Sequence, residues 1–142
     1  MITVVPATIA HARSIRLRPG DALEVAAYGI GAEQAIAQSM ARSLWAETYL
    51  IDGEVAAIVG LGLSTFVGGH GVPWLLTGPA CERHKRRFMN ESRRQVARML
   101  ETVSPLVNYV HADYARAIRW LAWLGFVIDP PQRGFCRFYM EA

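Results

Sequence analysis

The stretch from Leu106 to Phe126 is the part of the sequence that most constrains the fold. Residues 106–110 form an apolar run rich in β-prone side chains, which predicts a buried strand. From Ala115 onward apolar residues recur at helical spacing on two sides, which predicts a helix that is covered on both. Since a second apolar run follows the helix, the stretch predicts a βαβ-like unit of an α/β protein.

Both ends of this helix carry local signals. Asp113 lies in the polar break before the helix, where its side chain can accept hydrogen bonds as an N-cap. Gly125 follows the last helical residue and predicts a left-handed C-terminal cap, which costs least for glycine. Phe126 then supplies the apolar side chain that folds back onto the helix. The helix is therefore predicted to end at Gly125.

Length, composition and charge favour one globular domain over residues 1–142. Hydrophobic residues make up 52% of the chain and charged residues 19%, which is enough for a substantial core. The net charge of +3 suits an anionic small molecule, and no domain-wide basic excess supports nucleic-acid binding. Cys81 and Cys136 lack zinc-site spacing, so we expect a reducing compartment and no metal. Without a signal peptide or an apolar run that could cross a bilayer, we expect a cytoplasmic protein with no membrane partner.

The rest of the chain predicts helices and antiparallel strands before the central stretch. Asp52-Gly53 lies between two β-rich runs and is a strong signal for a two-residue hairpin turn. A long helix after the strand at 72–77 can cross over to the strand at 106–110, which makes these two strands parallel neighbours. In order, we predict a strand at Ile2–Val5, a turn at 18–21, helices at Ala22–Ala27 and Ala32–Ser43, strands at Trp45–Ile51, Val55–Leu63 and Val72–Thr77, a helix at Glu82–Val103 and a last strand at Phe135–Met140.

A basic cluster, Arg83 to Arg87, lies at the start of the long predicted helix. Cations there oppose the helix macrodipole, at a cost of about 0.3–1 kcal/mol each in the first turn. An anion bound at the helix N-terminus would explain them, because it would meet both the free N–H groups and the basic side chains. The alternative is a solvated basic face, since Arg93, Arg94 and Arg98 continue it along the helix.

Five residues of the central stretch have the spacing of a strand–helix–glycine pattern: Val110, Ala117, Ile118, Gly125 and Phe126. This pattern resembles the last part of the GNAT (Gcn5-related N-acetyltransferase) family. Ile-Arg-Trp-Leu at 118–121 and Leu-Gly-Phe at 124–126 also resemble a group of small tailed-phage GNAT-like proteins. The resemblance implies an α/β fold with a mixed, mostly antiparallel sheet of six or seven strands and helices on both faces.

The resemblance also implies acetyl-CoA as co-substrate, an acyl transfer to an amine, and a site for the cofactor. The pantetheine arm is expected along Leu75, Leu76 and Thr77. The phosphates are expected near the basic cluster, at Arg83, Lys85, Arg86 and Arg87. The chain departs from the family at residues 77–88, which lack the glycines of the phosphate-binding motif. It also departs at Leu121, which occupies the position of the family's usual tyrosine acid.

Three residues are candidates for acid–base chemistry. Glu47 is a carboxylate on a largely apolar strand face, and His111 ends the central strand, where open α/β sheets place ligands. Either could be the base, directly or through water. Tyr114 is the nearest replacement in sequence for the missing tyrosine acid. The backbone N–H that polarises the thioester carbonyl is expected near Leu76.

Two other functions remain open from the sequence. The chain can be a GNAT-fold module without catalytic activity that serves as a binding protein or as a structural part of a phage virion. A homodimer and a phage or host protein are alternative partners. If the chain is phage-encoded, we expect it in the host cytoplasm or in the virion.

Overall fold

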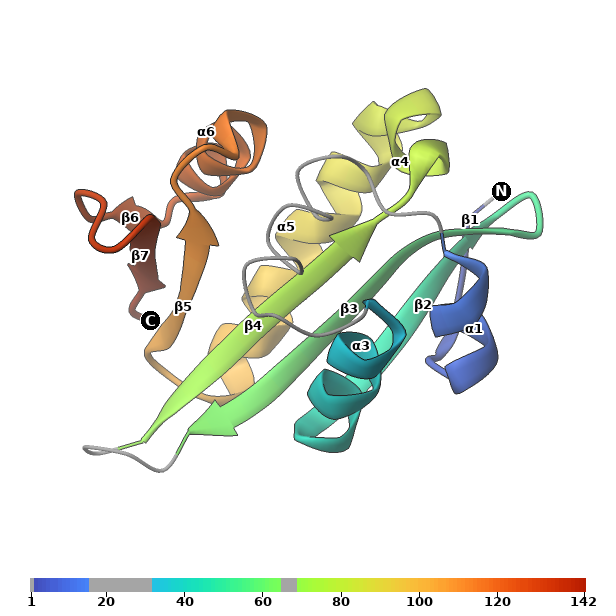
Figure 1. Ribbon diagram of the computed structural model, residues 1–142, viewed down its shortest axis with the longest axis horizontal. Helices are drawn as coiled ribbons and strands as arrows, with labels where there is room; N and C mark the ends of the chain where they lie inside the picture. The colour runs from blue at the N-terminus through green and yellow to red at the C-terminus, as the bar shows by residue number, and fades with distance from the viewer. Residues whose placement is uncertain (1, 16–31, 65–68) are drawn as a thin grey trace.

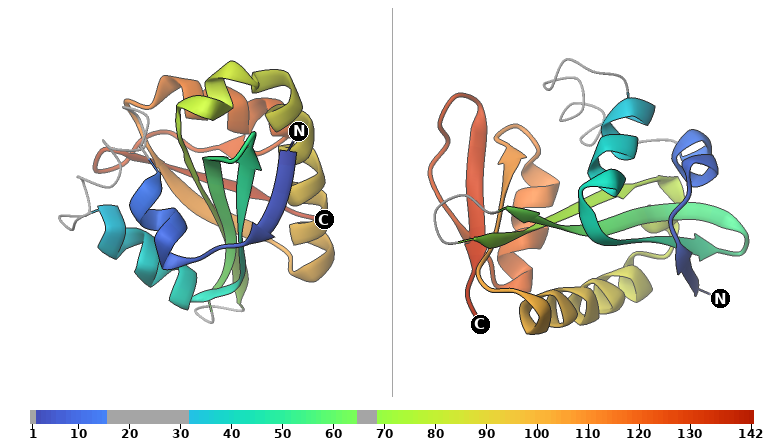
Figure 2. Two further views of the ribbon diagram at one scale, coloured as in Figure 1. Left: turned by 90° about the vertical axis from the view of Figure 1, so that its right-hand side faces the viewer. Right: turned by 90° about the horizontal axis from the view of Figure 1, so that it is seen from below.

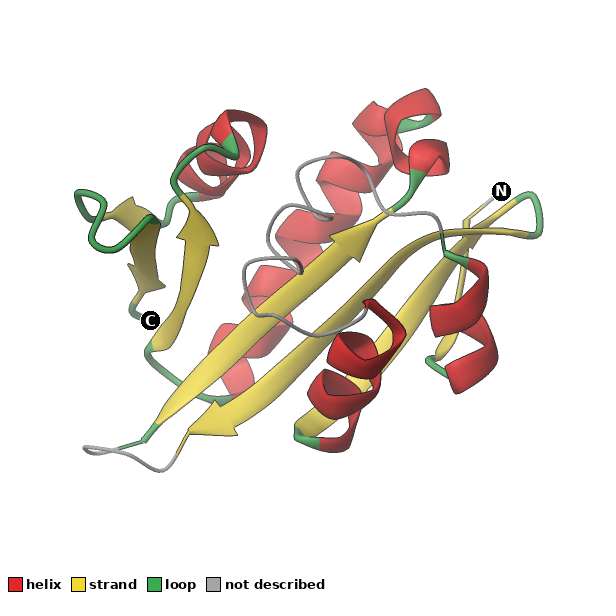
Figure 3. Ribbon diagram, in the orientation of Figure 1, coloured by secondary structure: helices red, strands yellow, loops and turns green. Residues whose placement is uncertain are grey.

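The computed structural model describes residues 2–15, 32–64 and 69–142, so the turn and helix predicted between residues 18 and 27 lie outside the described residues. It contains a seven-stranded mixed sheet in the order β1-β2-β3-β4-β5-β7-β6, antiparallel except between β4 and β5 (Figures 1 and 3). The predicted fold class is confirmed. The elements are β1 (Ile2–Pro6), α1 (Ile9–Ser14), α3 (Ala32–Ala41), β2 (Ser43–Ile51), β3 (Glu54–Ser64), β4 (His70–Thr77), α4 (Pro79–Arg83), α5 (Lys85–Thr102), β5 (Leu106–His111), α6 (Ala115–Leu124), β6 (Val127–Ile128) and β7 (Phe135–Met140).

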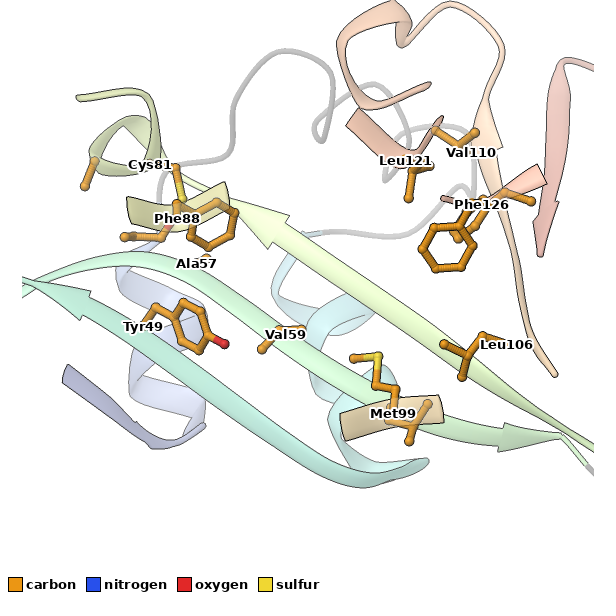
Figure 4. Packing of buried hydrophobic residues seen from close by; sticks show 14 of the residues in the cluster. Tyr49, Ala57, Val59, Cys81, Phe88, Met99, Leu106, Val110, Leu121 and Phe126 are labelled. Atoms are coloured by element: carbon orange, nitrogen blue, oxygen red, sulfur yellow. The ribbon is translucent and has the colours of Figure 1, made fainter. Parts of the chain in front are cut away.

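The helices cover opposite faces of the sheet. Helices α1 and α3 lie on one face, and α5 and α6 lie on the other (Figure 2). The core under α1 and α3 is small and centres on Ala12, Ile36 and Ile58. The larger core under α4, α5 and α6 includes Tyr49 and Phe88 (Figure 4).

The hairpin between β2 and β3 forms as predicted. Its turn residues Asp52 and Gly53 have φ values of 50° and 83°, the positive values that a tight two-residue turn of this kind needs. Ile51 pairs with Glu54 at the end of the ladder.

Strands β4 and β5 are parallel neighbours, as predicted, but they separate soon after they start. Gly71 pairs with Leu106, and the Gly71 N–H donates to the Pro105 carbonyl at 2.9 Å. Beyond this point the Asn108 side chain spans the gap and donates from Nδ2 to the Pro73 carbonyl at 2.6 Å. The two strands then diverge toward their C-terminal ends (Figure 1), so β4 has a backbone edge that β5 does not cover.

The single helix predicted over Glu82–Val103 is wrong, because the segment forms two helices. Helix α4 begins with Pro79 at its first position, where the missing N–H costs nothing. His84 then leaves the helical region, with φ −122° and ψ 37°, and α5 starts at Lys85. Helix α4 is held on the sheet by Cys81, whose Sγ donates to the Ala56 carbonyl at 3.1 Å.

The ends and exposure of α6 correct two further predictions. The residue before the helix is Tyr114, and Asp113 makes no cap: the Tyr114 N-cap has no side-chain hydrogen bond. Gly125 has φ 107°, so the left-handed end is confirmed, and Phe126 donates its N–H to the Leu121 carbonyl. The helix is covered on one side and not on two, since Trp123 remains 41% exposed beneath the Arg93 guanidinium.

Candidate functional site

A cavity of about 1030 Å³ passes through the gap between β4 and β5 and reaches both faces of the sheet. On the face covered by α3, its lining includes Arg42, Trp74 and Leu76. On the face covered by α5, it includes Leu75 and Phe88. The splay of two parallel strands therefore opens a continuous passage through the sheet, where an elongated ligand can bind.

The backbone N–H and C=O groups of successive β4 residues point alternately toward β3 and toward β5. The Gly71 N–H and the Pro73 carbonyl both bond toward β5, whereas the Gly78 N–H donates to the Ala56 carbonyl of β3 at 2.7 Å. Since the β3–β4 register has no irregularity, odd-numbered residues face β5 and even-numbered residues face β3. The Leu75 N–H therefore faces the gap, and the prediction that placed this donor near Leu76 is shifted by one residue.

The cations that line the cavity differ from those predicted. Lys85 lines it, but Arg86 lines a separate hollow of about 330 Å³ between α5 and α6. Arg83 pairs with Glu54 at 2.7 Å, on the side of the β2–β3 hairpin, and is not among the lining residues. Arg87 is exposed and is likewise outside the lining.

Helix α6 supplies the cations that the sequence prediction missed. Arg116 and Arg119 both line the cavity at the end where β4 and β5 diverge. Arg116 bonds to Glu82, which also lines the cavity, while Arg119 forms no ion pair with any residue in the described ranges. The signal was present in the sequence, because these two arginines interrupt an otherwise apolar helix.

The three predicted acid–base residues are not brought together. Tyr114 lines the cavity. His111 does not, because its ring packs edge-on against Phe135 at 5.3 Å and its Nδ1 accepts the Asp113 N–H. Glu47 also lies outside the lining, and its Oε1 accepts from Arg98 at 2.7 Å. Of the three, Tyr114 alone is placed to touch a ligand in the cavity.

Three buried polar atoms in the cavity lining have no hydrogen-bond partner among the described residues: Tyr49 Oη, Gln95 Oε1 and Trp120 Nε1. Their side chains come from β2, α5 and α6, and the rings of Tyr49 and Trp120 both pack on Phe88. Burying an unpaired polar group costs about 1–3 kcal/mol. These atoms are shielded from the open part of the cavity, and the Tyr49 hydroxyl lies close to the Gln95 amide, a donor beside an acceptor. No sequence motif predicts these buried polar atoms.

Burial raises the pKa of Tyr49 to about 12, against an ordinary value of 10.0. The nearby Gln95 amide acts in the opposite direction but more weakly, without forming a hydrogen bond of ordinary geometry. The phenol therefore keeps its proton at neutral pH, where it is available as a buried donor.

We expect this phenol to make stability fall at alkaline pH. In the unfolded chain a tyrosine ionises near pH 10, whereas Tyr49 in the fold keeps its proton until about pH 12. The free energy of unfolding should therefore decrease by up to about 2–3 kcal/mol as the pH rises from 10 to 12. Urea unfolding at pH 9 and at pH 11.5 measures this loss. Tyr49→Phe should show a smaller loss than the unsubstituted chain, and an equal loss in both would contradict the assignment.

The described residues contain no helix long and apolar enough to cross a membrane. Within the same residues, no group of three histidine, cysteine or acidic side chains could hold a metal ion. Cys81 and Cys136 are both free and buried.

Comparison with solved structures finds this fold in several acetyltransferases. The GNAT domain of PAT from S. lividans superposes with a TM-score of 0.69, at 12% identity over 98% of this chain and 89% of that one. The fold is that of the GNAT acetyltransferases. The PaiA N-acetyltransferase from Thermoplasma acidophilum, solved with coenzyme A, gives a TM-score of 0.66 at 10% identity over 100% and 99% of the two chains.

A third GNAT-like structure, yncA from Salmonella typhimurium solved with its cofactor acetyl-CoA, gives a TM-score of 0.57 at 17% identity, over 99% of this chain and 93% of that one. No family model matches the sequence, and no curated protein matches it. At these identities the likeness concerns the fold, so the chemistry has to be argued from the residues of this chain.

Proposed function

We propose that this protein transfers an acyl group from acetyl-CoA to an amine by direct attack of the amine. The observation that carries the proposal is the gap between β4 and β5, with the Leu75 N–H facing into it. A backbone N–H fixed beside a cavity can stabilise negative charge that develops on a carbonyl oxygen. The GNAT fold of the PaiA and yncA structures, which were solved with coenzyme A and acetyl-CoA, supports the same ligand here.

The lining of the cavity suits an acyl-CoA. Leu75, Leu76 and Thr77 would flank the pantetheine arm, whose amides need hydrogen-bonding partners inside a largely apolar passage. Lys85 and Arg119 would meet the phosphates at the divergent end of the gap. They supply charge there in place of the glycine-rich loop that residues 77–88 lack.

Acetyl-CoA bound in this way would supply an acetyl group as a thioester. The Leu75 N–H would donate to the carbonyl oxygen while the amine nitrogen bonds to the carbonyl carbon. As the carbon–sulfur bond breaks, the Tyr114 hydroxyl would give its proton to the leaving sulfur. The proton lost by the amine would pass to His111 or Glu47 through water, because neither of these side chains lines the cavity.

We expect CoA release to depend on Tyr114. Tyr114→Phe keeps the ring in the cavity and removes the proton donor, so turnover should fall by about 10²-fold with little change in the Kd of acetyl-CoA. Free-thiol release across an amine panel measures turnover, and calorimetry measures the Kd. Glu47→Gln is the comparison variant, and we expect a smaller effect there because Arg98 and Gln95 already engage this carboxylate.

Two outcomes would redirect the proposal. If acetyl-CoA binds but no amine gives turnover, the protein is a CoA-binding module with the GNAT fold. If neither acetyl-CoA nor coenzyme A binds at millimolar concentration, the function as a non-catalytic partner or virion component becomes the better proposal. The phage origin and the cytoplasmic location stay predictions from the sequence.

A further inference from the structure

The two sides of the cavity differ in how open they are. On the α5 face much of the lining belongs to the core, and the lining residues Tyr49, Phe88 and Met99 are at most 7% exposed. On the α3 face the lining includes the exposed residues Gln38 and Arg42. Figure 2 shows α3 and α5 on opposite sides of the sheet. The α3 face is therefore the side from which a second substrate can reach the gap between β4 and β5.

Two aromatic side chains line this opening on the α3 face. Trp74 of β4 packs there against the smaller core, and its indole leans over β3, where a Cβ at Gly60 would lie 2.3 Å from the ring. Its Nε1 donates to Ser43 Oγ at 2.7 Å, so the ring is turned away from β5. Tyr109 of β5 is 52% exposed and points to the same face, because the next residue, Val110, packs in the core under α5.

Arg42 carries a positive charge on this side of the cavity. It lies directly after α3, where its N–H donates to the Gln38 carbonyl at 3.2 Å, and its own carbonyl oxygen would be 3.6 Å from a Cβ at Gly62. Gly62 pairs with Val72 of β4. Arg42 therefore lies beside the first half of β4. Its guanidinium forms no ion pair within the part of the chain that the structure describes.

No carboxylate of the described lining residues offsets this charge on the α3 face. Glu82 is the one acidic residue among them, and it is bonded to Arg116 at the divergent end of the gap. A polyamine or an aminoglycoside would bring several positive charges close to Arg42, and like charges at an interface repel. A carboxylate, in contrast, can accept two parallel hydrogen bonds from a guanidinium.

We infer that the acceptor is an amino carboxylate, whose amine attacks the thioester at Leu75 while its carboxylate binds Arg42. The inference rests on the proposed function, which places the thioester there. Leu75 follows Val72 by three residues along β4, which corresponds to about 10 Å, and the Arg42 side chain covers part of this distance. The methylene groups of the acceptor would lie along β4 beside the Trp74 indole. The products are the N-acetylated amino acid and coenzyme A, formed by the bond changes described above.

A series of α,ω-amino acids from glycine to 6-aminohexanoate tests this inference. Each is compared with the n-alkylamine in which a methyl group replaces the carboxylate, and free-thiol release with acetyl-CoA gives kcat/KM. At the best chain length, we expect kcat/KM of the amino acid to exceed that of its alkylamine by about tenfold or more, because the methyl group cannot pair with the guanidinium. The diamine of equal length should be the poorest substrate of the three. The length at which the preference peaks measures how far the carboxylate site lies from the thioester.

Variants of Arg42 separate carboxylate binding from a structural role. Arg42→Gln should raise KM of the amino acid about tenfold, with little change in kcat or in the alkylamine. Arg42→Lys should retain part of the preference, since it keeps the charge but not the planar fork. Arg13→Gln is the matched control: Arg13 is exposed on α1, which lies on the same face of the sheet, but it is outside the lining, so the preference should not change.

A cation that follows a helix C-terminus also stabilises the helix, so each variant is checked by thermal melting. If Arg42→Gln lowers the Tm but leaves the preference for the carboxylate unchanged, Arg42 has only a structural role and the inference is overturned.

Two further results separate this inference from the proposed function. If amines are acetylated but every amino acid equals its alkylamine, or the diamines are preferred, the inference is overturned and the proposed function stands. Calorimetry in the presence of coenzyme A measures binding of the amino acids apart from turnover. If they bind in a manner that depends on Arg42 but are not acetylated, the proposed function fails and the carboxylate site stands. If neither amino acids nor amines bind or react, both are overturned.

Discussion

Replacement of Leu75 by proline is expected to lower kcat for acyl transfer by about 10²–10³-fold. The substitution removes the backbone N–H of residue 75, which the alternation of β4 directs into the gap. Loss of a single donor to a developing oxyanion typically costs this much. The effect should appear in kcat and much less in the Kd of acetyl-CoA, because the donor acts mainly as charge develops on the carbonyl oxygen.

The strand itself supports the use of proline in this test. β4 already contains Pro73 two residues earlier, at a position that also faces away from β3. A proline at residue 75 therefore breaks no hydrogen bond of the β3–β4 ladder. Leu75→Ala is the matched control, since it loses the same side chain but keeps the N–H. If Leu75→Ala lowers kcat as far as Leu75→Pro, the side chain matters and the proposed role of the amide is wrong.

The sequence predicted those parts of the fold that depend on local backbone chemistry. Gly125 has the left-handed conformation that its place after an apolar helix implied. Asp52 and Gly53 form the hairpin turn because few residues tolerate positive φ so easily. The parallel arrangement of β4 and β5 followed from the long helical segment between them, which can carry the chain back along the sheet as a crossover.

The composition of the site was less predictable, because it depends on where helices turn. Arg83 looked like a phosphate ligand within one long helix, but the break at His84 directs it toward Glu54. Arg119 lies on a helix more distant in sequence and lines the cavity instead. Only three-dimensional packing reveals such a rearrangement, because both arginines have the same local chemistry.

The buried pair of Tyr49 and Gln95 could not be found from sequence for a related reason. In the sequence, Tyr49 shares one strand face with Trp45 and Glu47 and carries no signal of its own. Its surroundings depend on Gln95, whose Nε2 donates to Glu47 Oε1 at 2.9 Å, and these contacts join residues far apart in sequence. Glu47 was predicted as a base, and in the structure it orients a neighbour.

The close approach of β3 to Trp74 leads to the largest expected change in stability. A Cβ atom at Gly60 would lie 2.3 Å from Trp74 Cε2, and the ring cannot move freely because its Nε1 donates to Ser43 Oγ at 2.7 Å. We therefore expect Gly60→Ala to destabilise the fold by about 2–3 kcal/mol through overpacking. For a chain of this size the Tm should fall by roughly 5–10 °C, measured by thermal melting.

Gly62 provides a matched control on the same strand. A Cβ there would meet its nearest neighbours at 3.6 Å, which is ordinary van der Waals contact, so Gly62→Ala should change stability by less than about 1 kcal/mol. The Trp74→Ala background separates the steric effect from any intrinsic cost of alanine in the strand. With the indole removed, Gly60→Ala should cost less than about 0.5 kcal/mol, which gives a coupling of about 2 kcal/mol between the two residues. An equal cost of Gly60→Ala in both backgrounds would show that the indole does not restrict residue 60.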